Sequence, residues 1–444
     1  MISARLAALL ARRDIHYGWV VAAATFLTML VTAGAMGAPG VLIVPLEKEF
    51  GWSTADISTA LAIRLVLFGL IGPFAAAFMN RFGVRTVTVT ALLMVAAGLL
   101  GSLVMRELWH LFVLWGLVVG VGTGLTALVL GATVATRWFT KRRGLVVGLL
   151  TASSATGQLI FMPLLADLSD RIGWRGGIVV IVALLAVAAV AVLVLMRDRP
   201  ADVDLAPYGE TAPYGENAIV PAPRTTQGLA ALATAPLFAL AEAARSRTFW
   251  ILFGTFFICG LSTNGLIQTH FVTLCGDYGM AAVAAAGVLA MMGLFDFAGT
   301  IGSGWLSDRY DNRWLLFWYY GLRGLALMAL PFSDFTLYGL SLFAVFYGLD
   351  WVATVPPTVR LSAERFGRER SNLVFGWIFT GHQLGAAAAA FGAGVTRTQL
   401  ASYLPAFFAA GAFCLVAALA VLFINRREKE KDGIPAAAPA PAKA

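Results

Sequence analysis

Residues 295–313 read FDFAGTIGSGWLSDRYDNR, and this stretch decides the fold. It begins with a carboxylate, Asp296, inside an apolar run and ends in a segment that carries charges of both signs. A weaker copy, NRFGVR at residues 80–85, also follows an apolar run, and its first residue lies 228 positions before Asp308. Two copies of one loop at about half-chain spacing indicate an internal repeat.

The composition is that of a membrane protein. The 444 residues are 59% hydrophobic and only 13% charged, with a mean hydropathy of +0.80, whereas soluble proteins have about 25% charged residues. Twelve apolar runs are each long enough to cross a hydrocarbon core of about 30 Å: 18–43, 54–79, 85–105, 110–135, 145–166, 176–196, 248–272, 282–306, 314–332, 336–358, 372–395 and 402–424. Because no alternating strand pattern competes, we expect helices rather than a barrel.

The net charge of +8 reflects topology rather than nucleic-acid binding. If the amino terminus is cytoplasmic, only five of the 32 Lys and Arg residues fall in outer loops, and two, Arg64 and Arg323, lie within spans. An excess of basic residues in cytoplasmic loops fixes orientation in membranes. We therefore expect a multi-pass protein of the bacterial inner membrane, with both termini in the cytoplasm and no nucleic-acid partner.

No motif for catalysis, metal binding or cofactor binding is present in the sequence. The four histidines are not helically paired, and neither a nucleophile elbow nor a phosphate loop occurs. The three cysteines are scattered in apolar surroundings, which is typical of small buried residues. We expect no enzyme activity, no metal and no cofactor.

The charge and proline content divides the chain into four parts. Residues 1–197 and 246–425 each hold six spans, while the proline-rich residues 198–245 form a cytoplasmic linker. Within the linker, Leu229 to Arg245 can form a short amphipathic helix at the membrane surface. The Ala/Pro-rich residues 426–444 are expected to form a disordered cytoplasmic tail.

The two loop copies resemble the signature of the major facilitator superfamily, which joins the second and third helix of each six-helix half. This resemblance implies an all-α fold of twelve transmembrane helices in two pseudo-symmetric bundles. It also implies a gating role for the polar and glycine positions of the loops, namely Asn80, Arg81, Gly83, Arg85, Gly304, Asp308, Arg309 and Arg313. The carboxylate of Asp308 is expected to meet a helix amino terminus and to stabilise the outward-facing state.

Two further segments resemble monocarboxylate transporters, including the bacterial branch that contains oxalate–formate antiporter-like proteins. These segments are Tyr17-Gly18-Trp19 and residues 137–158, with Ser153, Ser154, Gly157 and Gln158 after a basic turn. Asp296 falls where that family has the Asp of an Asp–Arg pair that couples protons to substrate. The Arg of the pair is Thr300 here, and a first-helix Lys of many animal members is Gly40.

Five ionisable residues lie near the middle of spans, where such side chains mark functional pathways: Arg64, Asp296, Arg323, Asp350 and His382. We expect Asp296 and Asp350 to couple protons. We expect Arg323 to be structural, and one possible role is to neutralise the charge of Asp296. The expected substrate-binding residues are Arg64, Asn264, Gln268, Asp350, Trp351 and His382. Arg64 is the candidate anion contact, because a guanidinium matches a carboxylate.

These observations predict a monomeric secondary active transporter of a small organic anion that works by alternating access and is coupled to protons. Since both cationic positions of the family are neutral, either Arg64 has taken over the anion contact or the substrate is not a simple monocarboxylate. Two alternatives stay open. One is an exporter of amphipathic compounds with the same fold, and the other is a membrane sensor that binds a ligand without moving it.

Overall fold

The computed structural model describes residues 2–126, 128–210, 229–366 and 371–424, and these residues contain helices but no β-strand. The tail and residues 211–228 of the linker lie outside the described residues, as do the side chains of Ser154 and Gln158. The fold is therefore the expected all-helical one.

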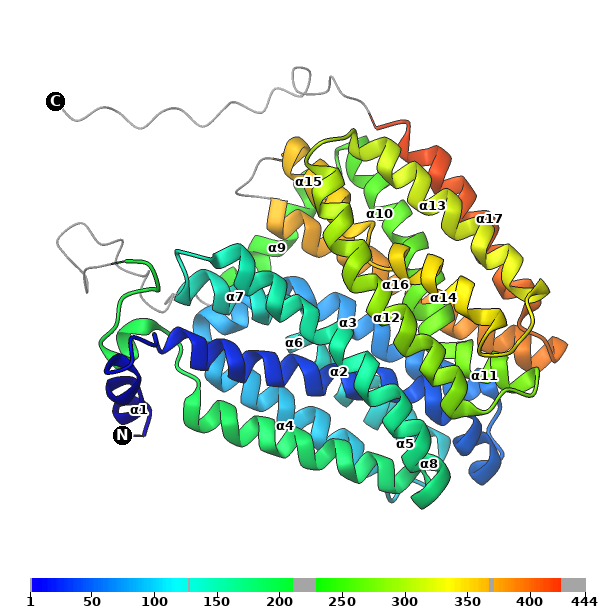
Figure 1. The fold of residues 1–444 in the computed structure, drawn as a ribbon, viewed down its shortest axis with the longest axis horizontal. Helices are drawn as coiled ribbons and strands as arrows, with labels where there is room; N and C mark the ends of the chain where they lie inside the picture. Colours follow the sequence, from blue (N-terminus) through cyan, green and yellow to red (C-terminus); the bar gives the residue numbers. More distant parts are fainter. Residues whose placement is uncertain (1, 127, 211–228, 367–370, 425–444) are drawn as a thin grey trace.

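The first bundle is built from residues 18–195, preceded by a short helix, and Figure 1 shows it in blue to green. Its elements are α1 (Ile2–Ala11), α2 (Gly18–Phe50), α3 (Thr54–Phe82), α4 (Val84–Ser102), α5 (Leu108–Leu111), the π-helix η1 (Phe112–Val119), α6 (Gly120–Leu125), α7 (Leu128–Trp138) and α8 (Arg143–Leu195). The long α8 contains two spans, because Gly173 has φ 78° and turns the chain between them.

The second bundle follows the linker elements η2 (Pro200–Val203) and α9 (Leu229–Ala243). Its elements are α10 (Arg247–Gly260), the π-helix η3 (Leu261–Gln268), α11 (Thr269–Asp277), α12 (Ala282–Ser307), α13 (Asn312–Ala329), η4 (Leu330–Phe332), α14 (Gly339–Asp350), α15 (Val355–Phe366), α16 (Ser371–Leu400) and α17 (Leu404–Val421). Within the described residues, ten helices or helix combinations are long and apolar enough to cross a membrane. The first part of α8 and α16 complete the twelve predicted spans.

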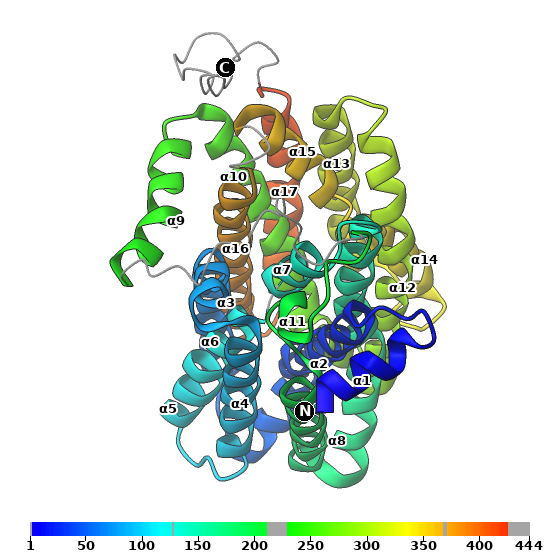
Figure 2. The same ribbon diagram turned by 90° about the vertical axis from the view of Figure 1, so that its left-hand side faces the viewer.

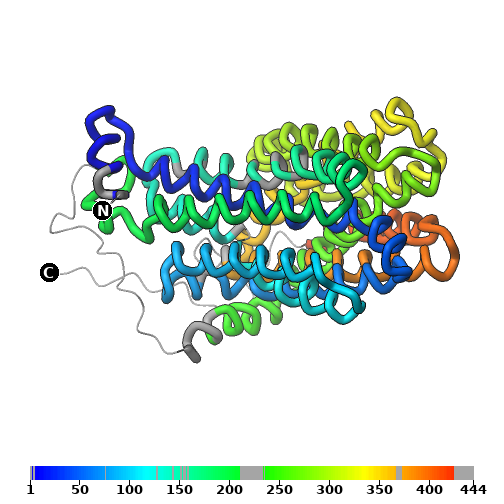
Figure 3. The backbone as a smooth tube through the Cα atoms, turned by 90° about the horizontal axis from the view of Figure 1, so that it is seen from below, coloured from blue at the N-terminus to red at the C-terminus, as the bar shows by residue number. Residues whose placement is uncertain are grey.

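The two bundles approach most closely at one end. We call the end at which α3 and α12 finish the linker side, and the end at which α3 and α12 begin the far side (Figures 1 and 3). Near the far side, Val41 and Met162 of the first bundle join the same buried cluster as Phe271 and Val288 of the second. This apolar contact holds the bundles together on the far side.

The helix α9 lies beside the bundles at the linker side (Figure 2) and packs on α3 and α16. It falls within the segment that the sequence indicates as amphipathic, and Phe238 on it is exposed. The indole Nε1 of Trp377 in α16 donates a hydrogen bond of 2.7 Å to the carbonyl of Pro236. The helix α9 of the linker thus contacts one helix of each bundle.

The helices α12 and α14 approach so closely that glycine is required at their crossing. A Cβ at Gly299 would collide with the backbone of Leu349, and a Cβ at Gly348 would collide with the backbone of Met292. Small residues permit such close approach of helices in membranes. This crossing brings the middle of α12 against the end of α14.

We predict that Gly299→Val lowers the stability of the second bundle by about 1–3 kcal/mol, because the added side chain overpacks the crossing. Gly302→Val on the same helix is the matched control, since a Cβ at Gly302 meets no atom within 4 Å. The measurement is the melting temperature of each purified variant in detergent. Equal melting temperatures for the two variants would contradict the close crossing.

Candidate functional site

A central cavity of about 480 Å³ lies between the two bundles. Its walls are mainly apolar and aromatic, with polar groups from both halves; the lining residues are Met29, Thr32, Ala33, Met36, Phe68, Thr123, Thr126, Gly148, Phe256, Cys259, Asn264, Gln268, Gly293, Asp296, Phe297, Thr300, Ile301, Trp351, Val352, Val355, Phe379, His382 and Gln383. The lining includes Gly148 near the start of α8 and Ile301 near the end of α12. The cavity therefore extends toward the linker side.

Five of the predicted site residues meet at this cavity: Asn264, Gln268, Asp296, Trp351 and His382. Asn264 and Gln268 belong to the π-helix η3, and His382 lies on α16, which packs directly against η3. Among the described residues that line the cavity, Asp296 is the one carboxylate, and none is Lys or Arg. The roles of these residues stay predictions, but the structure brings the side chains to one place.

Asp296 of α12 lies against a break between α14 and α15. The helix is interrupted over residues 351–354, just before Pro356 and Pro357. Because proline has no N–H, the carbonyls four residues earlier, those of Val352 and Ala353, lose their helical donors. In a membrane such groups need other partners.

The carbonyl of Val352 accepts from the backbone N–H of Val355 at 2.9 Å, and side chains of α12 bond to the rest of the break. The Ser303 hydroxyl donates to the carbonyl of Ala353 at 2.5 Å. The backbone N–H of Val352 donates to Asp296 Oδ1 at 2.9 Å, and the Thr300 hydroxyl donates to the same oxygen at 3.0 Å. Thr300 thus acts as a neutral donor to the carboxylate.

Arg323 of α13 binds the end of α14, on the other side of the break. Its side chain is 1% exposed, and its Nε donates to Asp350 Oδ2 at 2.5 Å. Its Nη2 donates to the carbonyls of Asp350 and Trp351 at 2.6 and 3.1 Å, and its Nη1 contacts Cys259 Sγ at 3.0 Å. The partner of Arg323 is therefore Asp350, whereas the sequence suggested Asp296 as one possibility.

Asp350 does not reach the central cavity. It is the last residue of α14, and the Arg323 guanidinium holds its carboxylate behind the cavity wall, in which the neighbouring Trp351 takes part. Arg64 does not line the cavity either, because α3 directs it into the interior of the first bundle. The structure thus separates Arg64 and Asp350 from the other predicted binding residues.

Sequence reasoning missed most of the apolar lining, including Met29, Met36, Phe68, Phe256 and Phe379. In spans that are apolar on every face, no sequence signal separates a cavity wall from a lipid-facing surface. The threonines Thr32, Thr123 and Thr126 were also missed. Their hydroxyls can bond to carbonyls of their own helices, as Thr32 does to Thr28 at 2.7 Å, so they give no strong signal of a site.

In the first of the two predicted gating loops, the end of α3 is tied to neighbouring helices. Arg137 Nη2 of α7 donates to Asn80 Oδ1 at 2.6 Å, and the Arg85 backbone N–H donates to Asp198 Oδ1 at 2.9 Å. Gly83 has φ 89°, and a Cβ there would strike the Asp198 carboxylate, which explains this glycine. Arg81 lies over the Phe82 ring at 5.6 Å.

The second loop has a similar arrangement with stronger charges. Arg360 Nη1 of α15 donates to Asp308 Oδ1 at 2.5 Å, so the carboxylate meets an arginine of its own bundle rather than a helix amino terminus. Arg309 lies over the Trp305 ring at 4.2 Å, and Arg313 pairs with Asp311 at 2.7 Å. A Cβ added at Gly304 would have no other atom within 4 Å. Both loops thus connect the second and fourth spans of their halves.

Two six-helix bundles around a shared central cavity define a multi-pass membrane transporter. The sequence profile of the Major Facilitator Superfamily matches residues 24–390, and the chain belongs to that family of transporters.

Within the family, the chain is similar to monocarboxylate transporters and to a bacterial transporter. The chain is 26% identical to monocarboxylate transporter 13 of Rattus norvegicus over 406 residues, which cover 90% of this chain and 87% of that protein. It is 22% identical to the uncharacterized MFS-type transporter YcxA of Bacillus subtilis over 392 residues, or 86% of each. A solved bacterial homolog of the human lysosomal transporter Spinster, inward-facing and occupied, shares the fold with a TM-score of 0.68 at 16% identity, covering 91% of this chain and 96% of that one.

We predict that Arg323→Gln and Asp350→Asn each destabilise the protein by about 3–5 kcal/mol, because each leaves an uncompensated buried charge. Replacing both with apolar residues, as Arg323→Met with Asp350→Leu, should restore much of the loss. The control is Asp308→Asn, whose exposed pair with Arg360 is worth only about 0–1 kcal/mol. Melting temperatures in detergent test this, and a small effect of both single variants would contradict a structural role for the pair.

We further predict that Asp308→Asn shifts the protein toward the state that is open on the linker side. The exposed pair of Asp308 with Arg360 contributes little, whereas contact with a helix amino terminus in the opposite state would add a helix-dipole interaction. Asn80→Ala, which removes no charge, should shift the balance less. Accessibility of single cysteines from each side measures the shift. Equal shifts in both variants would contradict the larger effect expected for the charged residue Asp308 than for the neutral Asn80.

Proposed function

We propose that the protein is a secondary active transporter of a small organic anion, coupled to protons and working by alternating access. One observation carries this proposal: Asp296 is the single carboxylate among the described residues that line the central cavity. The residue is 7% exposed and held by two donors, and among the described residues it has no ion-pair partner in the substrate space. The names of the relatives as monocarboxylate transporters support the same substrate class.

The coupling follows from electrostatics in a poorly hydrated space. An anion that enters the cavity is repelled by an ionised Asp296, and this repulsion disappears when the carboxylate binds a proton. A proton and an anion therefore each increase the affinity of the cavity for the other, and the linkage is reciprocal. Cotransport of one proton with one monocarboxylate would follow from this linkage.

The walls of the cavity suggest the form of the substrate. Aromatic and aliphatic side chains, such as Phe256, Phe379 and Trp351, fit an apolar body, while the amides of Asn264 and Gln268 can donate to a carboxylate. The volume of about 480 Å³ lies within the range of small-molecule sites. We infer a monocarboxylic acid with an apolar body rather than a polyanion.

The remaining expectations belong to this proposal. The basic residues favour a cytoplasmic linker side and a bacterial inner-membrane location, since cytoplasmic loops have an excess of Lys and Arg. In that orientation the central cavity extends toward the cytoplasm. We propose that one chain is sufficient for transport, because the cavity is formed by the two halves of a single chain.

A second candidate is an exporter of amphipathic cations or neutral compounds. The observation that favours it is the absence of Lys and Arg from the described cavity lining, together with the carboxylate of Asp296 and large apolar walls. A lipophilic cation could pair directly with an ionised Asp296, and a proton would then compete with it. Monocarboxylates and lipophilic cations should therefore be compared in the same assay.

We predict that Asp296→Asn abolishes uphill accumulation of monocarboxylates driven by a pH gradient but retains exchange of substrate for substrate. The amide keeps the size of the side chain and removes proton binding. The measurement is radiolabelled uptake into proteoliposomes with and without the gradient, and Asp170→Asn controls for loss of an exposed acidic residue outside the cavity. Accumulation at the wild-type rate in Asp296→Asn would reject this residue as the coupling group, and proton-driven flux of lipophilic cations alone would favour the exporter.

A further inference from the structure

We propose that Arg64 and Trp115 form a second binding site, inside the first bundle, for a small monovalent anion such as a halide or a carboxylate group. The site is separate from the central cavity, and its existence does not depend on the proposed transport. Only the suggestion that the transported acid itself supplies the carboxylate rests on the proposed function.

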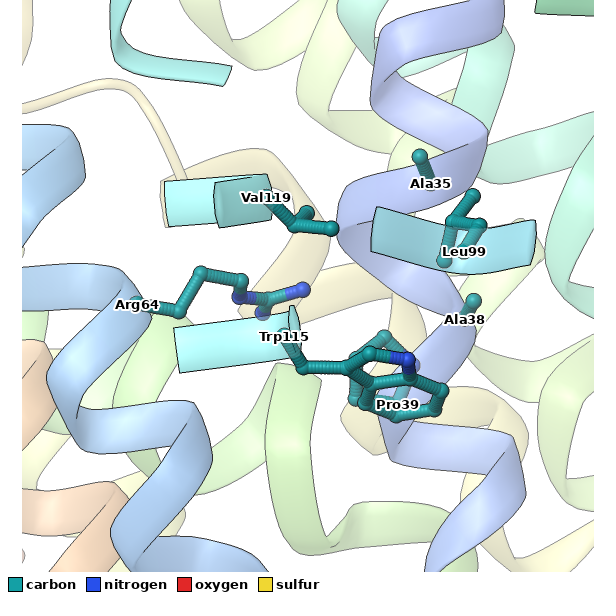
Figure 4. Close-up of a pocket in the computed structure, with 7 residues that line it drawn as sticks. All are labelled: Ala35, Ala38, Pro39, Arg64, Leu99, Trp115 and Val119. Carbon is teal, nitrogen blue, oxygen red and sulfur yellow. The ribbon is translucent and has the colours of Figure 1, made fainter. Parts of the chain in front are cut away.

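The pocket is defined by two side chains without partners. Arg64 of α3 is 5% exposed, and within the described part of the protein its Nε and Nη1 have no hydrogen-bond partner. Trp115 of η1 is 2% exposed, and its Nε1 also has none. Figure 4 shows the guanidinium extending from α3 toward the stretch of α2 that contains Ala35 and Ala38, with the indole beside it.

The lining has the chemistry of an anion site. Besides Arg64 and Trp115 it consists of Ala35, Ala38, Pro39, Leu99 and Val119, so its polar side-chain atoms are all donors. A guanidinium and an indole can donate hydrogen bonds but cannot accept them. A halide or carboxylate accepts from both, whereas a cation finds no side-chain ligand.

The charge of Arg64 favours a bound anion. An uncompensated charge in the middle of a membrane protein is costly, and such residues normally pair with another charge or with backbone carbonyls. No Asp or Glu is among the residues that line this pocket. A competing explanation is a water molecule between Arg64 and the carbonyl of Ala35, which lacks its helical donor because Pro39 has no N–H.

The pocket lies one helical turn beyond the central cavity. Phe68, four residues after Arg64, and Thr123, four residues after Val119, both line that cavity. Met36, next to Ala35, lines it as well. An anion at Arg64 would thus be close to the substrate space but inside a single bundle.

The gaps between these residues are too narrow for a free water molecule as the side chains stand. An anion therefore enters only when the Arg64 or Trp115 side chain turns aside. Gly120 packs so closely on α3 that a Cβ there would lie 3.1 Å from the Cα of Arg64, so this backbone contact is fixed and the movement must come from the side chains. We expect binding to be selective for small anions.

The test is the melting temperature of the full-length protein in detergent during titration with chloride, bromide, formate or acetate. Ionic strength is held constant with gluconate, which is too large for the pocket. We expect a saturable rise of several degrees in the wild type and its loss in Arg64→Gln. Trp115→Phe keeps the charge but removes one donor, and it should weaken the apparent affinity roughly threefold or more. Arg64→Lys should bind anions more weakly than the wild type, because an ammonium lacks the planar pair of N–H donors of a guanidinium.

Arg106→Gln is the matched control, since Arg106 is an exposed arginine of the same bundle. It should respond to anions as the wild type does. Because Arg64 does not line the central cavity, loss of the response in Arg64→Gln assigns the response to this site and not to the cavity of the transport proposal. Stabilisation by halides assigns the site to inorganic anions, and stabilisation by carboxylates alone assigns it to organic acids; both outcomes require Arg64. An unchanged response in Arg64→Gln, or no saturable response in the wild type, would overturn the proposal. If Arg64→Gln does not fold, an unchanged affinity in both Arg64→Lys and Trp115→Phe overturns it.

Discussion

The interaction on which the second bundle depends is the contact of the Arg323 guanidinium with the end of α14. A broken helix inside a membrane exposes carbonyls that water cannot reach, and each must find a donor within the protein. Arg323 donates to two of these carbonyls and to the Asp350 carboxylate. One side chain thus satisfies the backbone and balances a buried charge at the same point.

The same break connects structure to the candidate coupling group. Val352 lies in the interrupted segment, lines the central cavity and donates its N–H to Asp296. A change in the protonation of Asp296 therefore acts directly on a backbone segment that is not held by helical hydrogen bonds. Because Trp351 belongs to both the segment and the cavity wall, the proton and the substrate would influence one short stretch of chain.

The two halves use charge differently although they are related by an internal repeat. In the second half the buried arginine has a carboxylate partner, and the loop carboxylate Asp308 pairs with Arg360. In the first half the corresponding loop has Asn80, and the buried Arg64 has no protein partner at its Nε and Nη1 among the described residues. The first half therefore depends on a neutral amide and, in our proposal, on an anion from solution.

The sequence by itself determined the twelve spans, the repeat and the family resemblance, because apolar length and loop motifs are local properties of the chain. It also pointed to Asp296 and His382, since ionisable groups are rare in apolar spans. Only the tertiary structure decided that Arg323 pairs with Asp350 and that Arg64 faces away from the cavity. The rotation of a helix that is apolar all round has no periodic signal in the sequence, so packing against its neighbours alone decides which way each charge points.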